Sequence, residues 1–322
     1  MSKTHNTPRA LTIAGSDSGG GAGIQADLKA FARCGVHGTS AITAITAQNT
    51  LGVSAIHPIP AGIILAQVRA VIADIGVDAV KVGMLGTVEA ARVVAQALDE
   101  LPAGTPVVVD PVMVAESGAQ LLDPDAQDAL VAEILPRATI LTPNVPEARA
   151  LARHAPAAKR QASEDDSVSA PPRAGDSTRT VSAPGVGSSS TAGQLRSSDA
   201  DCEDDTEAHS LVRAVLALGP KIVVLTGGHR AQAIDLFLDS SSPDRIVSIP
   251  GERHPGGAAH GSGCTHSSVL AAQLALGRAP LQAAFAARAL AGRAVADGLR
   301  DVGEGPGPVD VIGLVRLRPR SE

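Results

Sequence analysis

The chain of 322 residues contains no tryptophan, no tyrosine and only 3 phenylalanines. Proteins that bind single-stranded nucleic acids stack the bases on aromatic side chains, so this shortage argues against that function. The formal net charge of −6 also leaves no general basic field for a nucleic-acid backbone. Because hydrophobic residues still make up 44% of the chain, we expect a core built mainly from small side chains such as Ala and Val.

Cysteine is also scarce, and Cys34, Cys202 and Cys264 lie far apart in the sequence. An odd number of cysteines without CxxC spacing argues against a disulfide framework and favours a reducing compartment. The histidines show no HxH or HExxH spacing, so we expect no zinc site and mostly surface or loop histidines. Cys34 follows the apolar face of a predicted helix and is expected to be a small core residue.

Long apolar runs are missing as well. Residues 1–9 are polar and lack the apolar segment of a signal peptide. The longest apolar candidate, residues 61–75, is interrupted by Gln67, Arg69 and Asp74, so it cannot be read as a membrane span. We therefore expect a cytoplasmic protein without a membrane partner and without a nucleic-acid partner.

Short β-branched runs alternate with helical patterns along most of the chain, which predicts an α/β fold. We expect strands at residues 11–14, 40–46, 53–59, 79–82, 106–110, 138–142 and 222–226, and an antiparallel pair at 233–238 and 245–249. We expect helices at residues 23–34, 61–75, 87–98, 124–135, 210–218, 265–276, 280–300 and 309–315. This order predicts three layers, with helices on both faces of a central, mostly parallel sheet.

The alternation breaks between about residues 155 and 205, where Ser, Ala, Pro, Gly, Asp and Thr dominate. Such a segment buries too little apolar surface to offset the entropy cost of ordering it. We therefore expect a single domain over residues 1–322 that contains a low-complexity, disordered insertion at residues 155–205.

The segment from His260 to Thr265 combines a glycine-rich turn with the start of an alanine-rich helix. A helix N-terminus carries unpaired N–H groups and a partial positive charge, and glycines let an anion come close to the backbone. The same field is expected to lower the pKa of Cys264 and stabilise its thiolate. The segment therefore suggests phosphoryl transfer near Cys264; the alternative is a glycine helix cap beside an inert cysteine.

A second glycine-rich loop, residues 14–23, joins the first strand to the first helix. It lacks the lysine of a P-loop and fits a dinucleotide fingerprint poorly. Its five glycines favour a small ligand held against bare backbone, although a flexible turn is the alternative. After the next strand, Gln48 offers a carboxamide that can read a ring edge carrying an amino group and a ring nitrogen. A turn cap is the alternative for Gln48.

Ligands of open α/β sheets bind beyond the carboxyl ends of the strands. Asp110, Asn144 and Glu147 lie at such ends, and their oxygen atoms suit Mg²⁺. The alternative for Glu147 is a charge in the first turn of a helix. The segment from Thr226 to His229 could leave room for a nucleotide or form a plain turn. The same rule selects Gly15, Thr46, Gln48, Lys81, Met84, Val112, Thr142 and Gly228.

Together these motifs resemble the hydroxymethylpyrimidine/phosphomethylpyrimidine kinases of thiamine biosynthesis, in the ribokinase-like superfamily. The resemblance covers almost the whole chain outside the insertion and keeps the order of the family's motifs. It rests on residues 11–50, VKVGMLG at 80–86, DPVMVAESG at 110–118, LTPNVPEA at 141–148, TGGH at 226–229, HGSGCTHSS at 260–268 and EGPGPVD at 304–310.

The resemblance implies a three-layer ribokinase-like fold and the ATP- and Mg²⁺-dependent phosphorylation of 4-amino-5-hydroxymethyl-2-methylpyrimidine and then of its monophosphate. It implies a homodimer with a small-molecule pyrimidine substrate. By position, Cys264 would be the catalytic base within an anion hole of Gly261, Ser262 and Gly263, and Asp110 and Glu147 would organise Mg²⁺. The substrate would contact Gln48, Gly15, Ala22, Thr46, Met84 and Val112, and the nucleotide would contact Thr226, Gly228 and Asn144.

The sequence departs from the family at Thr226 and Glu116, where many relatives carry Lys. Two alternatives therefore stay open: a pyridoxal or pyridoxine kinase, and a non-catalytic pyrimidine-binding protein. Gln48 and Met84 favour the pyrimidine over the pyridine substrate, and the retained Cys264 and glycine loops favour an enzyme.

Overall fold

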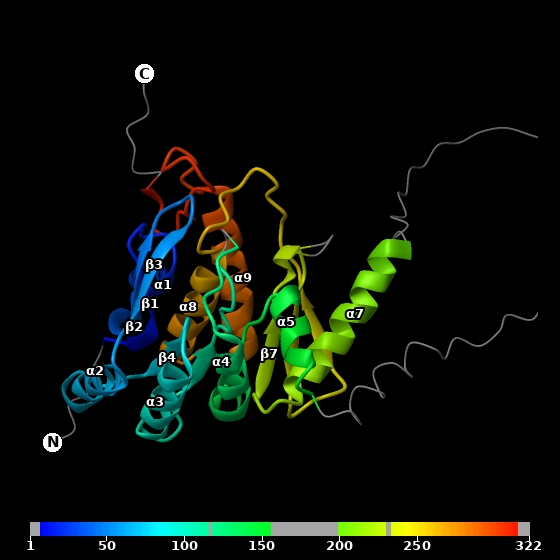
Figure 1. Cartoon of the computed structure of the whole chain (residues 1–322). Helices are drawn as coiled ribbons and strands as arrows, with labels where there is room; N and C mark the ends of the chain where they lie inside the picture. The colour runs from blue at the N-terminus through cyan, green and yellow to red at the C-terminus, as the bar shows by residue number, and fades with distance from the viewer. Residues whose placement is uncertain (1–6, 116–117, 156–198, 230–232, 315–322) are drawn as a thin grey trace, which may run out of the picture.

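The computed structural model describes residues 7–115, 118–155, 199–229 and 233–314. Its centre is a nine-stranded sheet with the strand order β3-β2-β1-β4-β5-β6-β7-β8-β9 (Figure 1). The strands are β1 (Arg9–Asp17), β2 (His37–Gln48), β3 (Val53–Pro58), β4 (Ala79–Val82), β5 (Val107–Val109), β6 (Ile140–Leu141), β7 (Ile222–Leu225), β8 (Asp235–Asp239) and β9 (Ile246–Ile249).

The sheet is mostly parallel, as predicted. Strands β2, β1, β4, β5, β6 and β7 run parallel to one another, so their carboxyl ends meet at one edge. Strand β3 pairs antiparallel with β2, and β8 and β9 extend the other end of the sheet in antiparallel pairing. The predicted antiparallel pair is therefore confirmed.

Helices cover both faces of the sheet and complete three layers (Figure 1). One face packs against α1 (Gly23–Arg33), α8 (Ser262–Ala275) and α9 (Pro280–Ala296). The other packs against α2 (Ala61–Asp74), α3 (Val88–Asp99), α4 (Pro124–Ala129), α5 (Val145–Ala152) and α7 (Asp199–Leu216). A π-helix (Leu130–Ile134) and a 3-10 helix (Leu135–Arg137) continue α4, and a 3-10 turn (Gly227–His229) follows β7.

Small aliphatic side chains fill the core, as the composition predicts. Strand β5 illustrates the alternation: Val108 faces the α8 side, whereas Val107 and Val109 face the other layer. Helix α9 buries alanines, Ala283, Ala284, Ala287, Ala291 and Ala294. Small side chains let helices approach closely, and α8 and α9 are accordingly in extensive contact.

The largest differences from the predicted helices and strands lie in two segments of the chain. Helix α7 begins at Asp199 rather than near residue 210, so the last part of the expected insertion, residues 199–205, is helical. The rest of that segment, residues 156–198, lies outside the described residues. Near the C-terminus, residues 309–313 are irregular, with a bend at 311–312, where a helix was predicted. Gly313 has a φ of +82°, and the Asp310 carboxylate accepts its N–H.

Candidate active site

A cavity of about 480 Å³ opens at the carboxyl edge of the parallel strands. Its walls come from several βα loops, from the start of α8 and from α9. It is the kind of concave, partly apolar site that small molecules occupy. All the residues proposed from the sequence line it: Gly15, Ala22, Thr46, Gln48, Met84, Asp110, Val112, Asn144, Glu147, Thr226, Gly228, Gly261, Ser262, Gly263 and Cys264.

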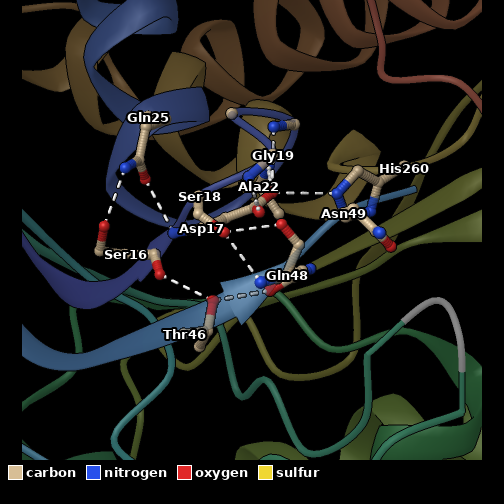
Figure 2. Close-up of polar contacts among 12 residues, drawn as sticks. Ser16, Asp17, Ser18, Gly19, Ala22, Gln25, Thr46, Gln48, Asn49 and His260 are labelled. Atoms are coloured by element: carbon tan, nitrogen blue, oxygen red, sulfur yellow. Dashed lines mark hydrogen bonds and ion pairs between the residues drawn. The ribbon is translucent and has the colours of Figure 1, made fainter. Parts of the chain in front are cut away.

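The first glycine-rich loop is organised by Asp17, at the end of β1. Figure 2 shows its carboxylate turned toward the loop and toward His260. One oxygen accepts the N–H of Gly19 at 2.7 Å, and the other accepts the N–H groups of Gly21 at 3.0 Å and Ala22 at 2.8 Å. The loop is therefore held by specific hydrogen bonds and is not a flexible turn.

The amide expected to read the substrate lies on the wall beside this loop. Gln48 Oε1 accepts a hydrogen bond from Thr46 Oγ1 at 3.2 Å, and Thr46 also donates to Ser16 O at 2.9 Å (Figure 2). Met84 packs on Gly15: a Cβ added at Gly15 would lie 3.1 Å from the sulfur of Met84. The pocket therefore combines a polar carboxamide with an apolar wall.

The second glycine-rich segment forms the N-terminus of α8 and opens into the cavity. Gly261 is its N-cap in the left-handed region, at a φ of +81°. The Ser262 N–H donates to Ala259 O at 2.9 Å, so the N–H groups of Gly263 and Cys264 are the ones that this turn can offer to an anion. Ser262, one of the residues expected to form an anion hole, therefore uses its N–H within the protein.

The Cys264 thiol does not have the lowered pKa expected from its helix position. Burial, together with the smaller effect of the Asp110 and Asp27 charges, raises the pKa of Cys264 to about 12. The Lys81 charge and a hydrogen bond from the Gly23 N–H act in the opposite direction but are outweighed. The expectation of a stabilised thiolate is therefore wrong for this site, because desolvation exceeds the field of the helix N-terminus.

Beneath α8 lies a buried ionic network that sequence reasoning missed. Lys81 on β4 is 0% exposed, and its Nζ lies 3.0 and 3.1 Å from the two carboxylate oxygens of Asp27 on α1. It also lies 3.7 Å from Asp110 Oδ2. Burial lowers the pKa of Lys81, but the carboxylates outweigh this and raise it well above its ordinary value. Lys81 therefore stays charged beneath the cavity.

Hydroxyl groups complete this network and tie α8 to the sheet. Asp27 accepts hydrogen bonds from Thr12 and Ser268, each at 2.6 Å. Asp110 accepts one from Ser267 at 3.0 Å. Burial raises the pKa of Asp110, although Lys81 acts to lower it. The network fixes the height of α8 above β1 and β4, and with it the position of Cys264.

Asn144 and Glu147 form a capping box at the start of α5. Asn144 Oδ1 accepts the Glu147 N–H and Glu147 Oε2 accepts the Asn144 N–H, both at 2.9 Å. Burial and then the charge of Asp110 raise the pKa of Glu147 to about 8. Glu147 thus caps the helix and also lines the cavity, so the two alternatives open for this residue are not exclusive.

The wall expected to face a nucleotide is built around Asp235. This buried carboxylate accepts the Gly227 N–H at 2.8 Å and lies 3.2 Å from His266 Nε2 on α8. The segment after β7 is thus a 3-10 turn that leads into the antiparallel strand β8, and Thr226 and Gly228 still line the cavity. His266 is 5% exposed and His260 is 8% exposed, so these two are exceptions to the expectation of mostly surface or loop histidines, whereas His37 and His57 are exposed. Glu116 lies outside the described residues.

Three further observations concern metal binding, membrane-spanning helices and cysteines. Within the described residues, no group of three or more His, Cys, Asp or Glu side chains is placed to hold a metal ion by itself. None of the described helices is long and apolar enough to cross a membrane. Cys34 and Cys264 are free thiols.

Comparison with known proteins gives a consistent result. The chain matches the family described as phosphomethylpyrimidine kinase over residues 17–170 and 189–310. It is 40% identical over 306 residues to a hydroxymethylpyrimidine/phosphomethylpyrimidine kinase of Rhizobium meliloti, covering 94% of this chain and 96% of that protein.

Solved structures agree with the sequence relatives. An ADP complex of Bacillus subtilis pyridoxal kinase superposes with a TM-score of 0.73 at 31% identity, covering 97% of this chain and 100% of that one. A phosphomethylpyrimidine kinase of Clostridium difficile superposes with a TM-score of 0.62 at 32% identity, covering 88% and 96%. The chain belongs to the phosphomethylpyrimidine kinase family.

Proposed function

We propose that the chain transfers the γ-phosphoryl group of ATP to the hydroxymethyl group of 4-amino-5-hydroxymethyl-2-methylpyrimidine, and then phosphorylates the monophosphate to the diphosphate for thiamine biosynthesis. One observation carries this proposal: a single cavity joins a ring-binding wall at Gln48, an anion-binding helix N-terminus at Gly263 and Cys264, and the wall at Thr226 and Gly228. Family membership supports the reaction class.

The decisive test is ADP release by the purified chain with the pyrimidine or pyridoxal as substrate. We expect a kcat/KM at least tenfold higher for the pyrimidine, because Gln48 can pair with an amino group next to a ring nitrogen, and the pyridine lacks that amino group. Turnover confined to pyridoxal would contradict the proposed substrate. Tight pyrimidine binding without ADP release would instead indicate a binding protein.

Gln48 is proposed as the base reader. A Gln48→Ala variant should lose roughly 1–3 kcal/mol of pyrimidine binding, since buried ring groups are left unpaired, and should keep its KM for ATP. Steady-state kinetics with each substrate varied in turn will measure both constants. Asn49→Ala, on an exposed neighbouring residue, is the matched control. An equal loss for both substrates would remove this role from Gln48.

The residues at Asp110 and Glu147 fit Mg²⁺. Their carboxylates are oxygen donors near enough for the charge of Asp110 to raise the pKa of Glu147, a repulsion that a cation would relieve. Protein carboxylates, water and substrate phosphates together make the usual ligand set of this ion. When bound, Mg²⁺ would neutralise phosphate charge and the carboxylates that raise the pKa of Cys264.

A Glu147→Gln variant separates the metal role from the cap. Glutamine can still accept the Asn144 N–H, so the melting temperature should change little, while the Mg²⁺ concentration for half-maximal rate should rise several-fold. Because the pKa of Glu147 is about 8, the parent's demand for Mg²⁺ should fall as pH rises through 8. The variant should lack this pH dependence. An unchanged Mg²⁺ requirement would leave Glu147 as a helix cap only.

The domain organisation, the location and the oligomeric state of the chain are proposed from its composition and its exposed residues. We propose one kinase domain over residues 1–322, cytoplasmic in location, in which residues 155–205 take no part in the chemistry. A variant with residues 156–198 replaced by a short Gly/Ser linker should keep its turnover.

A homodimer is proposed from the edge strand β3, which is exposed from Ser54 to Pro58. The nearby side chains of Ile45 and Ile63 are also 49% and 55% exposed. Light scattering should give twice 32.3 kDa.

A further inference from the structure

We propose that Asp17 and His260 are positioning residues that clamp the two glycine-rich segments of the cavity together. One segment, residues 15–23, holds the substrate ring, and the other, residues 260–264, offers the phosphate-binding N–H groups. Their hydrogen bond would set the distance between the substrate hydroxyl and the transferred phosphoryl group. The inference rests on the proposed function and adds a role that the substrate and phosphate contacts do not supply.

The first argument is the way Asp17 divides its hydrogen bonds. Its side chain is 2% exposed. Oδ2 accepts the N–H groups of Gly21 and Ala22 within its own loop and, at 3.0 Å, meets Nε2 of His260 from the other segment (Figure 2). One carboxylate oxygen therefore links two segments that are 243 residues apart in sequence.

The direction of this hydrogen bond follows from the charge of Asp17. Burial raises the pKa of Asp17, but hydrogen bonds from His260 and from the Ala22 and Gly19 N–H groups outweigh burial and hold it below its ordinary value. An ionised carboxylate can only accept, so His260 donates from Nε2. A side chain that keeps an N–H donor at this point can thus replace the imidazole.

The second argument is the close packing of the two segments. A Cβ added at Gly261 would lie 1.7 Å from Gly21 O, and one added at Gly21 would lie 2.2 Å from Cδ2 of His260. A further link is the hydrogen bond from the Gly23 N–H to Cys264. Because the segments touch at backbone level, a shift of one displaces the other.

The third argument is that the C-terminal segment holds the backbone of His260 in place. Its carbonyl accepts the Val309 N–H at 3.1 Å, and it forms a parallel β-bridge with Pro308. The C-terminal segment therefore fixes His260, and His260 fixes the substrate loop. A displacement of about 1 Å between reacting groups can reduce turnover by roughly 10²-fold, so a contact of this kind can govern kcat.

The test compares two substitutions at one position. His260→Gln keeps an N–H donor but cannot accept a proton at neutral pH, whereas His260→Phe keeps bulk and loses the donor. We expect His260→Phe to lower kcat by roughly 10²-fold with the KM for ATP within twofold. We expect His260→Gln to recover kcat to within about fivefold of the parent, with an unchanged pH profile. His37→Phe, on an exposed histidine, is the matched control.

Opposite outcomes would overturn the inference. A His260→Phe enzyme near the parental rate shows that the clamp does not govern turnover. A His260→Gln enzyme as slow as His260→Phe, with a pH limb removed, shows that His260 works as an acid or base instead. A third readout needs no turnover: ¹H–¹⁵N spectra of the labelled parent, with His260 assigned from the His260→Gln spectrum, should show a proton on Nε2. An unprotonated Nε2 overturns the inference even if His260→Phe does not fold.

The same measurements separate this inference from the proposed function. If the parent releases no ADP with the pyrimidine, the proposed function fails, and the NMR result still decides whether the clamp exists. If the parent is active and the three variants behave alike, only the clamp is rejected.

Discussion

Replacing Lys81 by methionine should destabilise the protein by about 3–5 kcal/mol, because it leaves buried carboxylates without their cation. Lys81 Nζ lies within 3.1 Å of both Asp27 oxygens and 3.7 Å from Asp110. Methionine fills a similar volume, so the loss reflects charge rather than a cavity. Urea unfolding at pH 7 will measure the change, and Lys221→Met, at an exposed position, is the matched control.

The pH dependence of the same variant gives a second check. In the parent, the raised pKa of Lys81 means that the stability from its charge is fully present below the unfolded pKa and is lost only as pH rises through the folded value. In Lys81→Met, Asp110 loses the cation that lowers its pKa, so it can take up a proton as pH falls. The difference in unfolding free energy between parent and variant should therefore shrink toward low pH. A pH-independent difference under about 1 kcal/mol would show that the network is not important for stability.

The walls of the site could be predicted from the sequence because topology places them. Parallel strands bring their carboxyl ends to one edge, so residues such as Gly15, Gln48 and Asn144 converge without any knowledge of side-chain contacts. The glycine segments were found for a similar reason: tight turns and helix starts leave a local sequence signal. The strands and helices could be predicted from the periodic spacing of hydrophobic residues, which is kept even though most of these residues are small and aliphatic.

What the sequence did not reveal depends on contacts between distant segments. The strand-end rule selected Lys81, but the sequence does not show that α1 and α8 place Asp27 and Ser268 around it. The burial of His260 follows from the approach of Asp17, which no spacing rule encodes. The early start of α7 was hidden by its polar composition, although acidic residues are favourable in the first turns of a helix.

Cys264 illustrates how a correct local argument can be outweighed. Lys81 and the Gly23 N–H do lower the pKa of the thiol, but desolvation and the charges of Asp110 and Asp27 raise it by more, and these cannot be evaluated from the sequence. These effects depend on three-dimensional burial, and they reverse the direction of the pKa shift. The consequence is kinetic, because only the thiolate can accept a proton from the substrate.

A Cys264→Ala variant should lower kcat by roughly 10²–10⁴-fold while nearly keeping the KM for the pyrimidine, which is the usual span for a general base. The hydroxyl of the substrate is a poor nucleophile until its proton is removed, and Cys264 lies at the helix turn that would hold the transferred phosphoryl group. Cys34→Ala is the matched control, because Cys34 is a free thiol that does not line the cavity.

The pH profile makes this prediction specific to the thiolate. With a pKa of about 12, the thiolate fraction grows tenfold for each pH unit, so log kcat of the parent should rise with a slope near one between pH 7 and 9. Cys264→Ala should lack that slope and keep only the rate that the Gly263 and Cys264 backbone N–H groups support. Cys264→Asp should recover part of the activity with a flat profile over this range, because a carboxylate is a base that is ordinarily ionised throughout it. A Cys264→Ala enzyme that turns over near the parental rate, with the slope intact, would make the thiol a bystander and assign catalysis to the helix N-terminus alone.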